Sequence, residues 1–482
     1  MLLSDLLIDI EVLRLEGSPE KEISGIEFDS RKVTAGCLFV ATVGTAADGH
    51  DYIDKAIETG ATVIVCERLP EKLYQKVTYV QVSDSAKALG QLASAWFGHP
   101  SEKLILTGVT GTNGKTTVAT LLYRLFKTLG YKAGLLSTVS NYVDDKVVEA
   151  THTTPDALTL NDLLHQMVAA GCTHAFMEVS SHAIEQQRIA GLEFDGGIFT
   201  NLTRDHMDYH VTFENYLKAK KAFFDQLSPA SFALVNVDDK NGLVMVQNSK
   251  TRKFTYSMRG MADYKTKILE HGFEGMLLDM NGREVNVPFI GKFNAANLTA
   301  VFGTAVLLGI DETEALRVIS MLQAVSGRFE TVSAPAGFIA IIDYAHTPDA
   351  LNNVISTINQ ILQGNGRLIT VVGCGGNRDK GKRPMMAREA VDGSWKAVFT
   401  SDNPRFEDPQ SILDDMIDGL DTTQKNKYLS IIDRREAIKT ACALAQSGDV
   451  VLVAGKGHED YQIVQGVKYH FDDREEVRKS IF

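Results

Sequence analysis

The sequence is poor in cysteine, and its few cysteines are not arranged in pairs. Five occur in 482 residues, and no two of them have the two-residue spacing of a CxxC motif. This argues against a disulfide framework and against a zinc site with the usual cysteine spacing, and it favours a reducing compartment. We expect each thiol to serve as a small core residue. The cysteines are Cys37, Cys66, Cys172, Cys374 and Cys442.

Long apolar runs and an excess of positive charge are also missing. No stretch approaches the roughly 18 apolar residues of a membrane span. Residues 1–17 interrupt their apolar positions with Asp5, Asp9 and Glu11, which predicts an amphipathic helix and not a signal peptide. The formal net charge of −12 argues against a general nucleic-acid-binding protein, which needs a cationic surface. We therefore expect a cytoplasmic protein with no membrane insertion and no nucleic-acid partner.

What the sequence does contain is a long alternation of apolar strands and helical patterns. The length predicts two or three domains. The alternation from residue 104 onward is typical of parallel sheets covered by helices, and a second such series begins near residue 329. Between them, at 250–290, short strands and an Asn281-Gly282 turn predict a hairpin. Expected strands lie at 37–42, 61–66, 104–107, 173–179, 197–201, 232–237, 339–343, 368–373, 397–400 and 450–454; expected helices lie at 118–129, 213–224, 295–308, 312–322, 350–362 and 412–420.

The segment 104–117 carries the clearest chemical signal. An apolar strand runs into Gly-Thr-Asn-Gly-Lys-Thr-Thr at 111–117, and a helical pattern starts at once. Glycines let backbone N–H groups approach phosphate oxygens, and a helix N-terminus favours an anion. In such a loop Lys115 reaches the terminal phosphates, and Thr116 offers its hydroxyl to Mg²⁺. Although Val109 replaces the first glycine of the strict motif, the loop predicts binding of a nucleoside triphosphate.

Polar residues follow two later strands. Glu178 closes an apolar strand, so we expect its carboxylate at the sheet edge that holds the phosphate loop. There it suits a Mg²⁺ ligand, and the alternatives are a helix cap or a solvated strand end. The loop at 200–210 contains His206 among other histidines and aspartates, which is a weak indication of metal or base chemistry. Lys220 lies on an amphipathic helix, and its pattern alone predicts a solvated lysine.

Taken in order along the chain, these and further segments resemble the Mur ligase family. The resemblance implies an α/β fold of three domains: an N-terminal mixed α/β UDP-binding domain (1–99), a central P-loop ATPase-like domain with a parallel sheet (100–328) and a C-terminal Rossmann-like doubly wound domain that binds an amino acid (329–482). The segments are 28–50, TGTNGKTT at 110–117, TTP at 153–155, MEVSSHA at 177–183, TNLTRDHMDYH at 200–210, GKFNAANLTA at 291–300, GRFE at 327–330, DYAHTPDAL at 343–351, GCGGNRDKGKRP at 373–384, SDNPR at 401–405 and GKGHEDYQ at 455–462.

The resemblance implies an ATP-dependent ligase that adds meso-2,6-diaminopimelate to UDP-N-acetylmuramoyl-L-alanyl-D-glutamate in peptidoglycan precursor synthesis. ATP phosphorylates the D-glutamyl carboxylate and an amine attacks the acyl phosphate, so the protein has mainly to position reactants and neutralise charge. It also implies two Mg²⁺ ions. The implied catalytic residues are Lys115, Glu178, His206 and Lys220; the implied metal ligands are Thr116, Glu178, His206 and Lys220 as N6-carboxylysine, because the setting Tyr216 to Lys220 matches the family's carbamylated lysine.

Substrate-binding residues are implied in the same way, by position in matching motifs. For Thr153, Thr154 and Ser180, helix capping is an alternative, because TTP and SSHA both precede helical patterns. Asp343 and His346 are assigned to the nucleotide site without a defined role. The ATP-binding residues are Gly111, Thr112, Asn113, Gly114, Lys115, Thr116, Thr117, Asn294 and Arg328; the residues for UDP-N-acetylmuramoyl-dipeptide are Ser30, Thr45, Ala46, Ala47, Thr153, Thr154, Ser180, Gln186 and Arg188; those for diaminopimelate are Arg378, Asp402, Asn403, Pro404, Arg405, Gly455 and Glu459.

The string DNPR at 402–405 bears on which amine is added. Diaminopimelate differs from lysine by a second carboxylate at its far end, and the guanidinium of Arg405 could pair with it in a bidentate manner. Relatives that add lysine usually lack this arginine pattern, so the string favours diaminopimelate. The alternative is that Arg405 only forms a salt bridge with Glu407 or Asp408 in a turn.

Three other functions remain open at this point. Folylpolyglutamate synthetase shares the phosphate loop and the three-domain plan, but the segment 28–50 and the DNPR string fit the cell-wall ligase better. A nucleotide-binding scaffold without activity is disfavoured because the four catalytic positions are intact. A P-loop kinase would produce a phosphorylated compound in place of a new amide. We expect a monomer.

Overall fold

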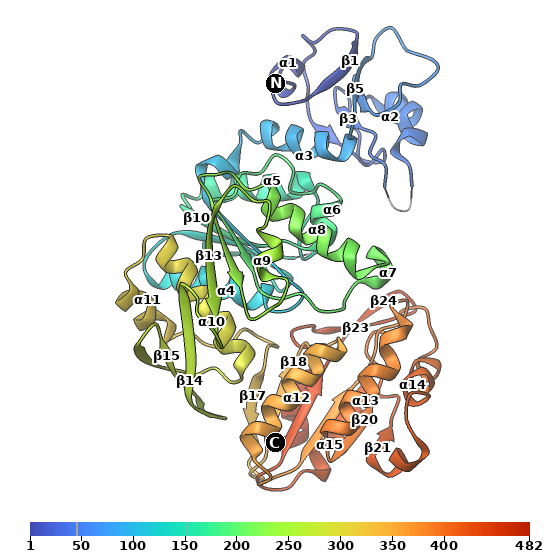
Figure 1. Ribbon diagram of the computed structural model, residues 1–482. Coiled ribbons are helices and arrows are strands. Elements are labelled where there is room, and N and C mark those ends of the chain that lie inside the picture. Colours follow the sequence, from blue (N-terminus) through green and yellow to red (C-terminus); the bar gives the residue numbers. More distant parts are fainter. Residues whose placement is uncertain (45–46, 151) are drawn as a thin grey trace.

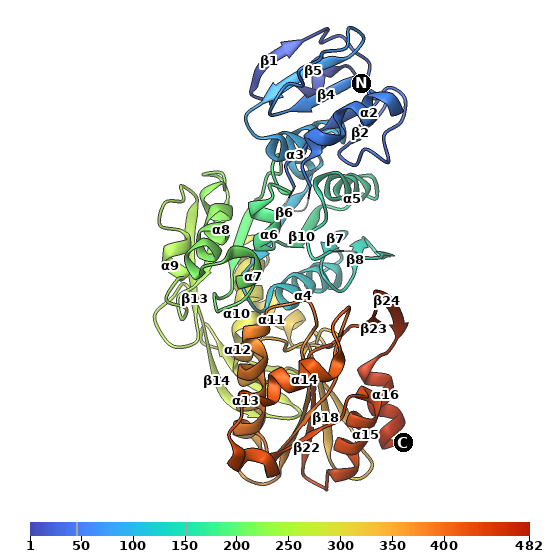
Figure 2. The same ribbon diagram turned by 90° about the vertical axis from the view of Figure 1, so that its right-hand side faces the viewer.

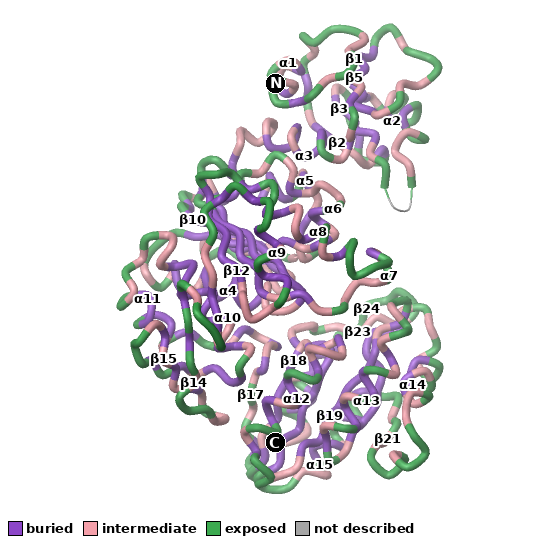
Figure 3. The backbone as a smooth tube through the Cα atoms, viewed as in Figure 1, coloured by how far each residue is buried: buried purple, intermediate pink, exposed green. Residues whose placement is uncertain are grey.

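The computed structural model describes residues 1–44, 47–150 and 152–482. It consists of α/β bodies that follow one another in chain order (Figure 1). The N-terminal body lies at one end and the C-terminal body at the other, with the central body between them, and the view turned by 90° shows the same succession (Figure 2). Buried residues follow the strands of the central and C-terminal sheets, whereas loop tips and outer helix faces are exposed (Figure 3). None of the helices in the described ranges combines the length and apolar character that a bilayer crossing requires.

The N-terminal body is a small sheet with helices packed against it. The sheet has the order β1-β5-β4-β3-β2, in which β1 is antiparallel to β5 and the remaining neighbours are parallel. The predicted helix over 1–17 is wrong beyond its first turn, because the segment after α1 pairs with β5 as an edge strand. The elements are α1 Leu3–Leu6, β1 Val12–Glu16, β2 Ile26–Glu27, β3 Leu38–Val40, η1 Gly49–Tyr52, α2 Ile53–Thr59, β4 Val63–Cys66, β5 Thr78–Val82 and α3 Ser85–Trp96.

The central body is built on a long mixed sheet in the order β16-β15-β14-β13-β12-β11-β6-β10-β7-β8-β9. The strands from β13 to β7 run parallel, as the sequence predicts, but both edges are antiparallel because short turns join their strands. The predicted Asn281-Gly282 hairpin joins β15 to β16. The strands are β6 Ile105–Thr110, β7 Ala133–Leu136, β8 Asn141–Val143, β9 Lys146–Val148, β10 His174–Glu178, β11 Gly196–Phe199, β12 Phe232–Asn236, β13 Arg252–Ser257, β14 Tyr264–Gly272, β15 Gly275–Met280 and β16 Arg283–Val287.

Helices cover both faces of this sheet. One apolar core joins the sheet to α4, α10 and α11, and a second core joins the opposite face to α5, α6 and α8. From β6 the chain continues to β7 on one side of β6, and after β10 it crosses to β11 on the other side. In open α/β sheets ligands bind at such a switch point, so we expect them beyond the carboxyl end of β6. The helical elements are η2 Pro100–Lys103, α4 Lys115–Thr128, α5 Ala157–Ala169, α6 Ser181–Glu185, α7 Met207–His210, α8 Phe213–Asp225, α9 Gly242–Met245, α10 Lys292–Leu307 and α11 Glu312–Ile319.

The C-terminal body is a doubly wound sheet in the order β17-β18-β22-β19-β20-β21, parallel except for β17. Helices α12, α13 and α14 cover one face, and α15 and α16 cover the other. The separate hairpin β23–β24 lies beside the carboxyl ends of these strands. The elements are β17 Glu330–Ser333, β18 Ile339–Asp343, α12 Pro348–Leu362, β19 Leu368–Val372, η3 Lys380–Lys382, α13 Arg383–Gly393, β20 Lys396–Phe399, α14 Pro409–Ile417, η4 Thr422–Lys427, β21 Tyr428–Ser430, α15 Arg434–Leu444, β22 Val450–Ala454, β23 Tyr461–Val464, β24 Val467–His470 and α16 Asp473–Ile481.

Candidate active site

The predicted phosphate loop connects β6 to α4 and is held by tight backbone contacts. Gly111 has φ +149°, and a Cβ there would lie 1.9 Å from Thr200 Oγ1; Gly114 has φ +89°, and a Cβ there would lie 2.5 Å from Asn297 Oδ1. Only glycine fits both positions. Lys115 Nζ donates to the carbonyl oxygens of Gly111 at 2.9 Å and Thr112 at 2.8 Å. The backbone of the loop is therefore fixed, and the Lys115 ammonium is held by two of its carbonyl groups.

Lys220 lies directly behind this loop. Its side chain is 1% exposed, and Nζ donates to Gly111 O at 2.8 Å. Burial, with a smaller contribution from Lys115, holds the pKa of Lys220 well below its usual value. The solvated lysine that the helical pattern predicts is wrong here, because α8 turns this position toward the loop. The exposed ion pairs of α8 involve its neighbours Lys218 and Lys221 instead.

Glu178 is the last residue of β10 and ends beside the loop. Its Oε1 accepts a hydrogen bond from Thr138 N at 2.7 Å, whereas Oε2 is buried without a hydrogen-bond partner in the described structure. Both carboxylate and loop line a cavity of about 650 Å³, which we call the loop cavity. A buried, unpartnered carboxylate oxygen is costly unless a cation or donor reaches it. Thr116 Oγ1 lines the same cavity and is within 3.2 Å of Arg328 Nη2.

This donor set fits a hard divalent cation. Carboxylate and hydroxyl oxygens are ligands that Mg²⁺ prefers. Within the described residues no three His, Cys, Asp or Glu side chains gather as metal ligands would. An ion beside Glu178 would therefore need other oxygens to complete its shell, from Thr116 or from phosphate groups.

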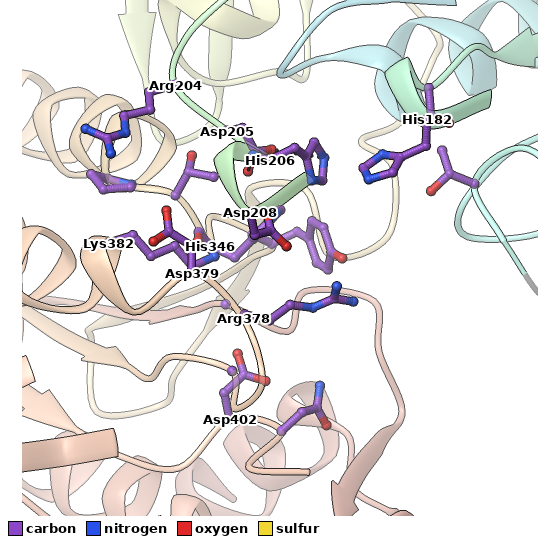
Figure 4. A pocket seen from close by; sticks show the side chains of 18 of the residues that line it. His182, Arg204, Asp205, His206, Asp208, His346, Arg378, Asp379, Lys382 and Asp402 are labelled. Carbon is purple, nitrogen blue, oxygen red and sulfur yellow. Dashed lines mark hydrogen bonds and ion pairs between the residues drawn. The ribbon is translucent and has the colours of Figure 1, made fainter. Parts of the chain in front are cut away.

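A second cavity, of about 510 Å³, lies between the central and C-terminal bodies, and we call it the interdomain cavity. Figure 4 shows His206 and its neighbours reaching in from the central body, and Arg378 and Asp402 reaching in from the C-terminal body. His206 has φ +55°, and its Nε2 is 3.3 Å from Asp205 Oδ2. Burial lowers the pKa of His206 to about 3, so the ring is neutral and can act as a metal ligand.

The two cavities share part of their lining. The shared residues are Thr153, Ser180, Asp205, His206, Tyr344, His346 and Asp349. The shared wall contains residues of both bodies, and Asn113 Nδ2 lies 3.4 Å from Asp349 Oδ2 across the boundary between them. A substrate carboxyl group near His206 would thus lie between the phosphate loop on one side and the 402–405 turn on the other.

The 402–405 turn follows β20 and faces the interdomain cavity through Asp402, Asn403 and Arg405. Arg405 Nη1 donates to Gly376 O at 2.8 Å, which orients the guanidinium. The alternative salt bridge of Arg405 with Glu407 or Asp408 is wrong. Glu407 instead pairs with Arg383 at 3.0 Å, and Asp408 accepts a hydrogen bond from Ser411 N as the N-cap of α14.

Of the remaining residues predicted to bind the amino acid, all but one line the interdomain cavity. Arg378, Gly455 and Glu459 line the interdomain cavity, whereas Pro404 does not. Gly455 has φ +114°, and a Cβ there would lie 3.0 Å from Asp402 Oδ2, so glycine permits the close approach of that carboxylate.

Asn294 and Arg328, the residues predicted for the nucleotide, both line the loop cavity, and their role stays a prediction. The Arg328 guanidinium lies over the Tyr344 ring, 4.4 Å from its centroid. Asn294 Nδ2 donates to Ile290 O at 2.8 Å. Asp343 accepts hydrogen bonds from Phe329 N and Ala345 N, and burial raises the pKa of its carboxyl group. Asp343 therefore shapes the loop that presents Tyr344.

Comparison with known proteins agrees with this geometry. Family models match three parts of the chain: "Mur ligase family, catalytic domain" at 22–97, "Mur ligase middle domain" at 109–305 and "Mur ligase, glutamate ligase domain" at 327–457. The chain belongs to the Mur ligase family. The resemblance inferred from the sequence motifs and the three-domain α/β fold class are thereby confirmed, whereas the exact domain boundaries stay a prediction.

Relatives of this Mur ligase cover its whole length. It is 59% identical over 482 residues to the UDP-N-acetylmuramoyl-L-alanyl-D-glutamate–2,6-diaminopimelate ligase of Bacteroides fragilis, covering 100% of this chain and 99% of the relative. It is 61% identical to the enzyme of the same name from Parabacteroides distasonis, with 99% of each covered. A solved structure of a ligase of that name is 32% identical, with a TM-score of 0.70 and coverage of 100% of this chain and 98% of the other.

The residues predicted for the muramoyl-peptide gather on the central body. Thr153, Thr154, Ser180 and Arg188 line the interdomain cavity. Gln186 does not, but its Oε1 accepts from Arg188 Nη2 at 2.6 Å and so holds that guanidinium. The capping alternative is right for Ser180, whose Oγ accepts from Ala183 N, and wrong for both threonines, because Asp156 caps α5.

Of the predicted uridine contacts, Ser30 and Ala47 line neither cavity. Ser30 is 8% exposed in the N-terminal body, and Ala47 is exposed there. Thr45 and Ala46 lie outside the described residues. The assignment of these four residues to UDP stays a prediction.

Several cavity residues of this Mur ligase were missed from the sequence. Lys382 Nζ donates to His346 O at 2.9 Å and lines the interdomain cavity, as does Arg204. Thr138 supplies the backbone N–H that orients Glu178. Lys382 stands in a matched motif and could have been singled out, whereas nothing in the sequence marks a backbone donor such as that of Thr138.

Proposed function

We propose that this Mur ligase joins meso-2,6-diaminopimelate to UDP-N-acetylmuramoyl-L-alanyl-D-glutamate, with ATP as co-substrate, as a cytoplasmic monomer of peptidoglycan precursor synthesis. The names of relatives that are 59–61% identical support it. The observation that carries the proposal is the shared wall at His206. It lets a phosphate donor on one side and an amino acid on the other reach one carboxyl group.

The phosphate loop performs the first task, which is to hold and neutralise the triphosphate. Its backbone N–H groups and the start of α4 receive the phosphates. In the structure the Lys115 ammonium donates to two loop carbonyls. When the triphosphate binds, this ammonium would turn to the terminal phosphates. Arg328 reaches the same place from the far side, fixed by the Tyr344 ring. Charge on the transferring phosphoryl group is thus met by cations from two separate segments of the chain.

Magnesium, when bound, supplies further charge neutralisation on the phosphate and carboxylate oxygens. Glu178 and Thr116 would hold one ion, and His206 and a carbamylated Lys220 would help hold a second. The lowered pKa of Lys220 supports the modification, because the neutral amine is the form that adds carbon dioxide and loses a proton. The product is an anionic oxygen ligand, which suits a hard cation.

The interdomain cavity performs the second task, which is to bring the amine to the acyl phosphate. Arg405 would take the distal carboxylate of diaminopimelate and Glu459 the distal ammonium. The presence of both residues in the lining of the interdomain cavity supports this assignment. Lysine lacks that carboxylate and would leave the guanidinium unpaired. Enclosure between two bodies also limits the access of water, which would hydrolyse an acyl phosphate.

Product analysis tests this function. The purified chain is incubated with ATP, Mg²⁺ and UDP-N-acetylmuramoyl-L-alanyl-D-glutamate, together with meso-diaminopimelate, L-lysine or no amine. We expect phosphate release that depends on diaminopimelate and a product whose mass equals the dipeptide substrate plus diaminopimelate minus water. A phosphorylated compound without a new amide would instead identify a kinase, and absence of ATP turnover would identify a scaffold.

A further inference from the structure

In the segment Gly455-Lys456-Gly457 the lysine side chain points into the interior of the C-terminal body. It follows β22, whose carboxyl end borders the interdomain cavity. Gly455 and Gly457 have φ +114° and +54°, and a Cβ at Gly457 would lie 2.6 Å from Gly327 O. These constraints fix the path of the backbone. Lys456 is 0% exposed as a result, which is rare for a lysine without a partner.

The Lys456 ammonium lies behind two carboxylates of the cavity wall. Its Nζ is 3.0 Å from Glu459 Oε2 and 4.0 Å from Asp402 Oδ1. It is also 3.5 Å from Asn403 Oδ1, while Asn403 Nδ2 donates to Glu459 Oε2 at 2.8 Å. Asp402, Asn403 and Glu459 line the cavity, whereas Lys456 does not. The lysine can therefore act on a bound amino acid only through these neighbours.

The nearby cations do not replace it. Arg434 is also fully buried, but it is paired in a bidentate manner with Asp473, at 2.8 Å and 2.7 Å. Arg405 directs Nη1 to Gly376 O and faces the cavity, where a substrate carboxylate would occupy it. Lys456 is thus the buried cation left to balance Asp402 and Glu459. The Glu459 carboxylate, which lies in a poorly solvated wall beside Asp402, needs such a charge to stay ionised.

The pKa of Glu459 reflects this balance. Burial and, next, Asp402 raise it, whereas Lys456 and Asn403 lower it. Removing the lysine charge would leave only the amide and the charge of Arg434, which is already paired with Asp473, to oppose the raising influences. The protonation of Glu459 at neutral pH would increase, and a neutral carboxyl group attracts an ammonium ion far less. The other titratable groups around Glu459 are Tyr344, Tyr461 and Arg434.

Building on the proposed function, we propose that Lys456 is a positioning residue for the incoming amino acid: its buried ammonium orients the Glu459 carboxylate and keeps it charged beside Asp402 and Asn403, so that the cavity wall presents this carboxylate to the distal ammonium while Arg405 takes the adjacent carboxylate. The cavity wall would then bind the distal ammonium and the distal carboxylate of the amino acid at the same time. The lysine itself touches no substrate atom.

Two variants separate charge from packing. Lys456→Met keeps an unbranched apolar side chain and removes the charge, and Lys456→Gln also removes the charge but retains a hydrogen-bond donor. We expect both to raise the KM for diaminopimelate about 10-fold or more, the effect of losing a charged hydrogen-bond partner, with the KM for ATP within about twofold. In both variants the KM for diaminopimelate should fall as pH rises from 6 to 9, because Glu459 ionises, whereas the wild-type enzyme should show a flatter profile.

A double-mutant cycle with Glu459→Gln gives the decisive comparison. If Lys456 acts through Glu459, the variant with both changes should be no more impaired than Glu459→Gln alone. Additive losses would overturn the proposal, and so would a wild-type KM for diaminopimelate in both single variants or an equal rise in the KM for ATP. Failure of both single variants to fold would assign the lysine a structural role and overturn it as well. If the wild-type enzyme itself shows no phosphate release that depends on diaminopimelate, the proposed function fails, and not the role of Lys456.

Discussion

Arg405→Lys is the substitution that addresses amino-acid selection most sharply. In the described structure Arg405 uses Nη1 for Gly376 O, while its Nε and Nη2 have no hydrogen-bond partner. Those two N–H groups form an edge that matches a carboxylate. Lysine keeps the charge and a Cβ, so the backbone at φ +54° is under no new constraint, but it replaces the planar edge with a single ammonium.

The expected size follows from the bonds that are lost. A bidentate guanidinium–carboxylate pair becomes a single charged contact, which removes one charge-assisted hydrogen bond worth about 1.5 kcal/mol. That energy corresponds to a rise of about 10-fold in the KM for diaminopimelate. L-Lysine has no distal carboxylate, so its KM should not rise. The preference for diaminopimelate over lysine should therefore shrink by about the same factor, while the KM for ATP stays unchanged.

The assay is ATP-dependent phosphate release at saturating UDP-N-acetylmuramoyl-L-alanyl-D-glutamate, with each amine varied in turn. Arg388→Lys is the matched control, because Arg388 is an exposed residue of α13 in the same body and lines neither cavity. Equal increases in the KM values of diaminopimelate, lysine and ATP for Arg405→Lys would refute the assignment of Arg405 to the distal carboxylate.

Three further predictions follow from buried groups. Glu178→Gln keeps the hydrogen bond from Thr138 N but removes the charge of the unpartnered oxygen, so kcat should fall about 100-fold with little change in the KM for diaminopimelate; an unchanged kcat would contradict a cation site there. Lys220 should give a carbamate ¹³C resonance in ¹³C-bicarbonate that persists in Lys218→Ala and disappears in Lys220→Ala; a signal in both would place the modification elsewhere. Burial lowers the pKa of His174 to about 4 in the folded chain, so stability should be complete above pH 6.5 and fall by about 3 kcal/mol toward pH 4; in His174→Gln, denaturant unfolding should lack this loss, and an identical pH profile would contradict the assignment.

The sequence predicts the fold well wherever local pattern and burial agree. The strands 339–343 and 450–454 coincide with β18 and β22, because a short apolar run between turn signals has few other interpretations. The edge formed by β8 and β9 was missed, since its strands are short, partly exposed and pair through local turns, whereas the hairpin at the other edge was predicted from Asn281-Gly282. The helix expected over 1–17 failed for a related reason. Pairing of Val12–Glu16 with β5, which lies some 65 residues later in the chain, outweighs the helical periodicity.

For the site, motifs identify residues but not their surroundings. The 111–117 loop was recognisable because its glycines and lysine recur at fixed spacing. Lys220 shows the limit, since the local pattern predicts a solvated side chain and only the packing of α8 against Gly111 buries it. The sequence likewise does not reveal that Glu407 pairs with Arg383 and not with Arg405. Arg383 lies 24 positions earlier in the chain, and only the folded turn brings it to that carboxylate.

The central claim is that one carboxyl group is activated at the junction of the two cavities. It is tested most directly by ¹⁸O transfer. UDP-N-acetylmuramoyl-L-alanyl-D-glutamate carrying two ¹⁸O atoms in the reacting D-glutamyl carboxylate is converted with ATP and diaminopimelate, and both products are examined by mass spectrometry. Formation of an acyl phosphate predicts one ¹⁸O in the released phosphate and one in the new amide. Unlabelled phosphate alongside an amide product would contradict activation of that carboxyl group.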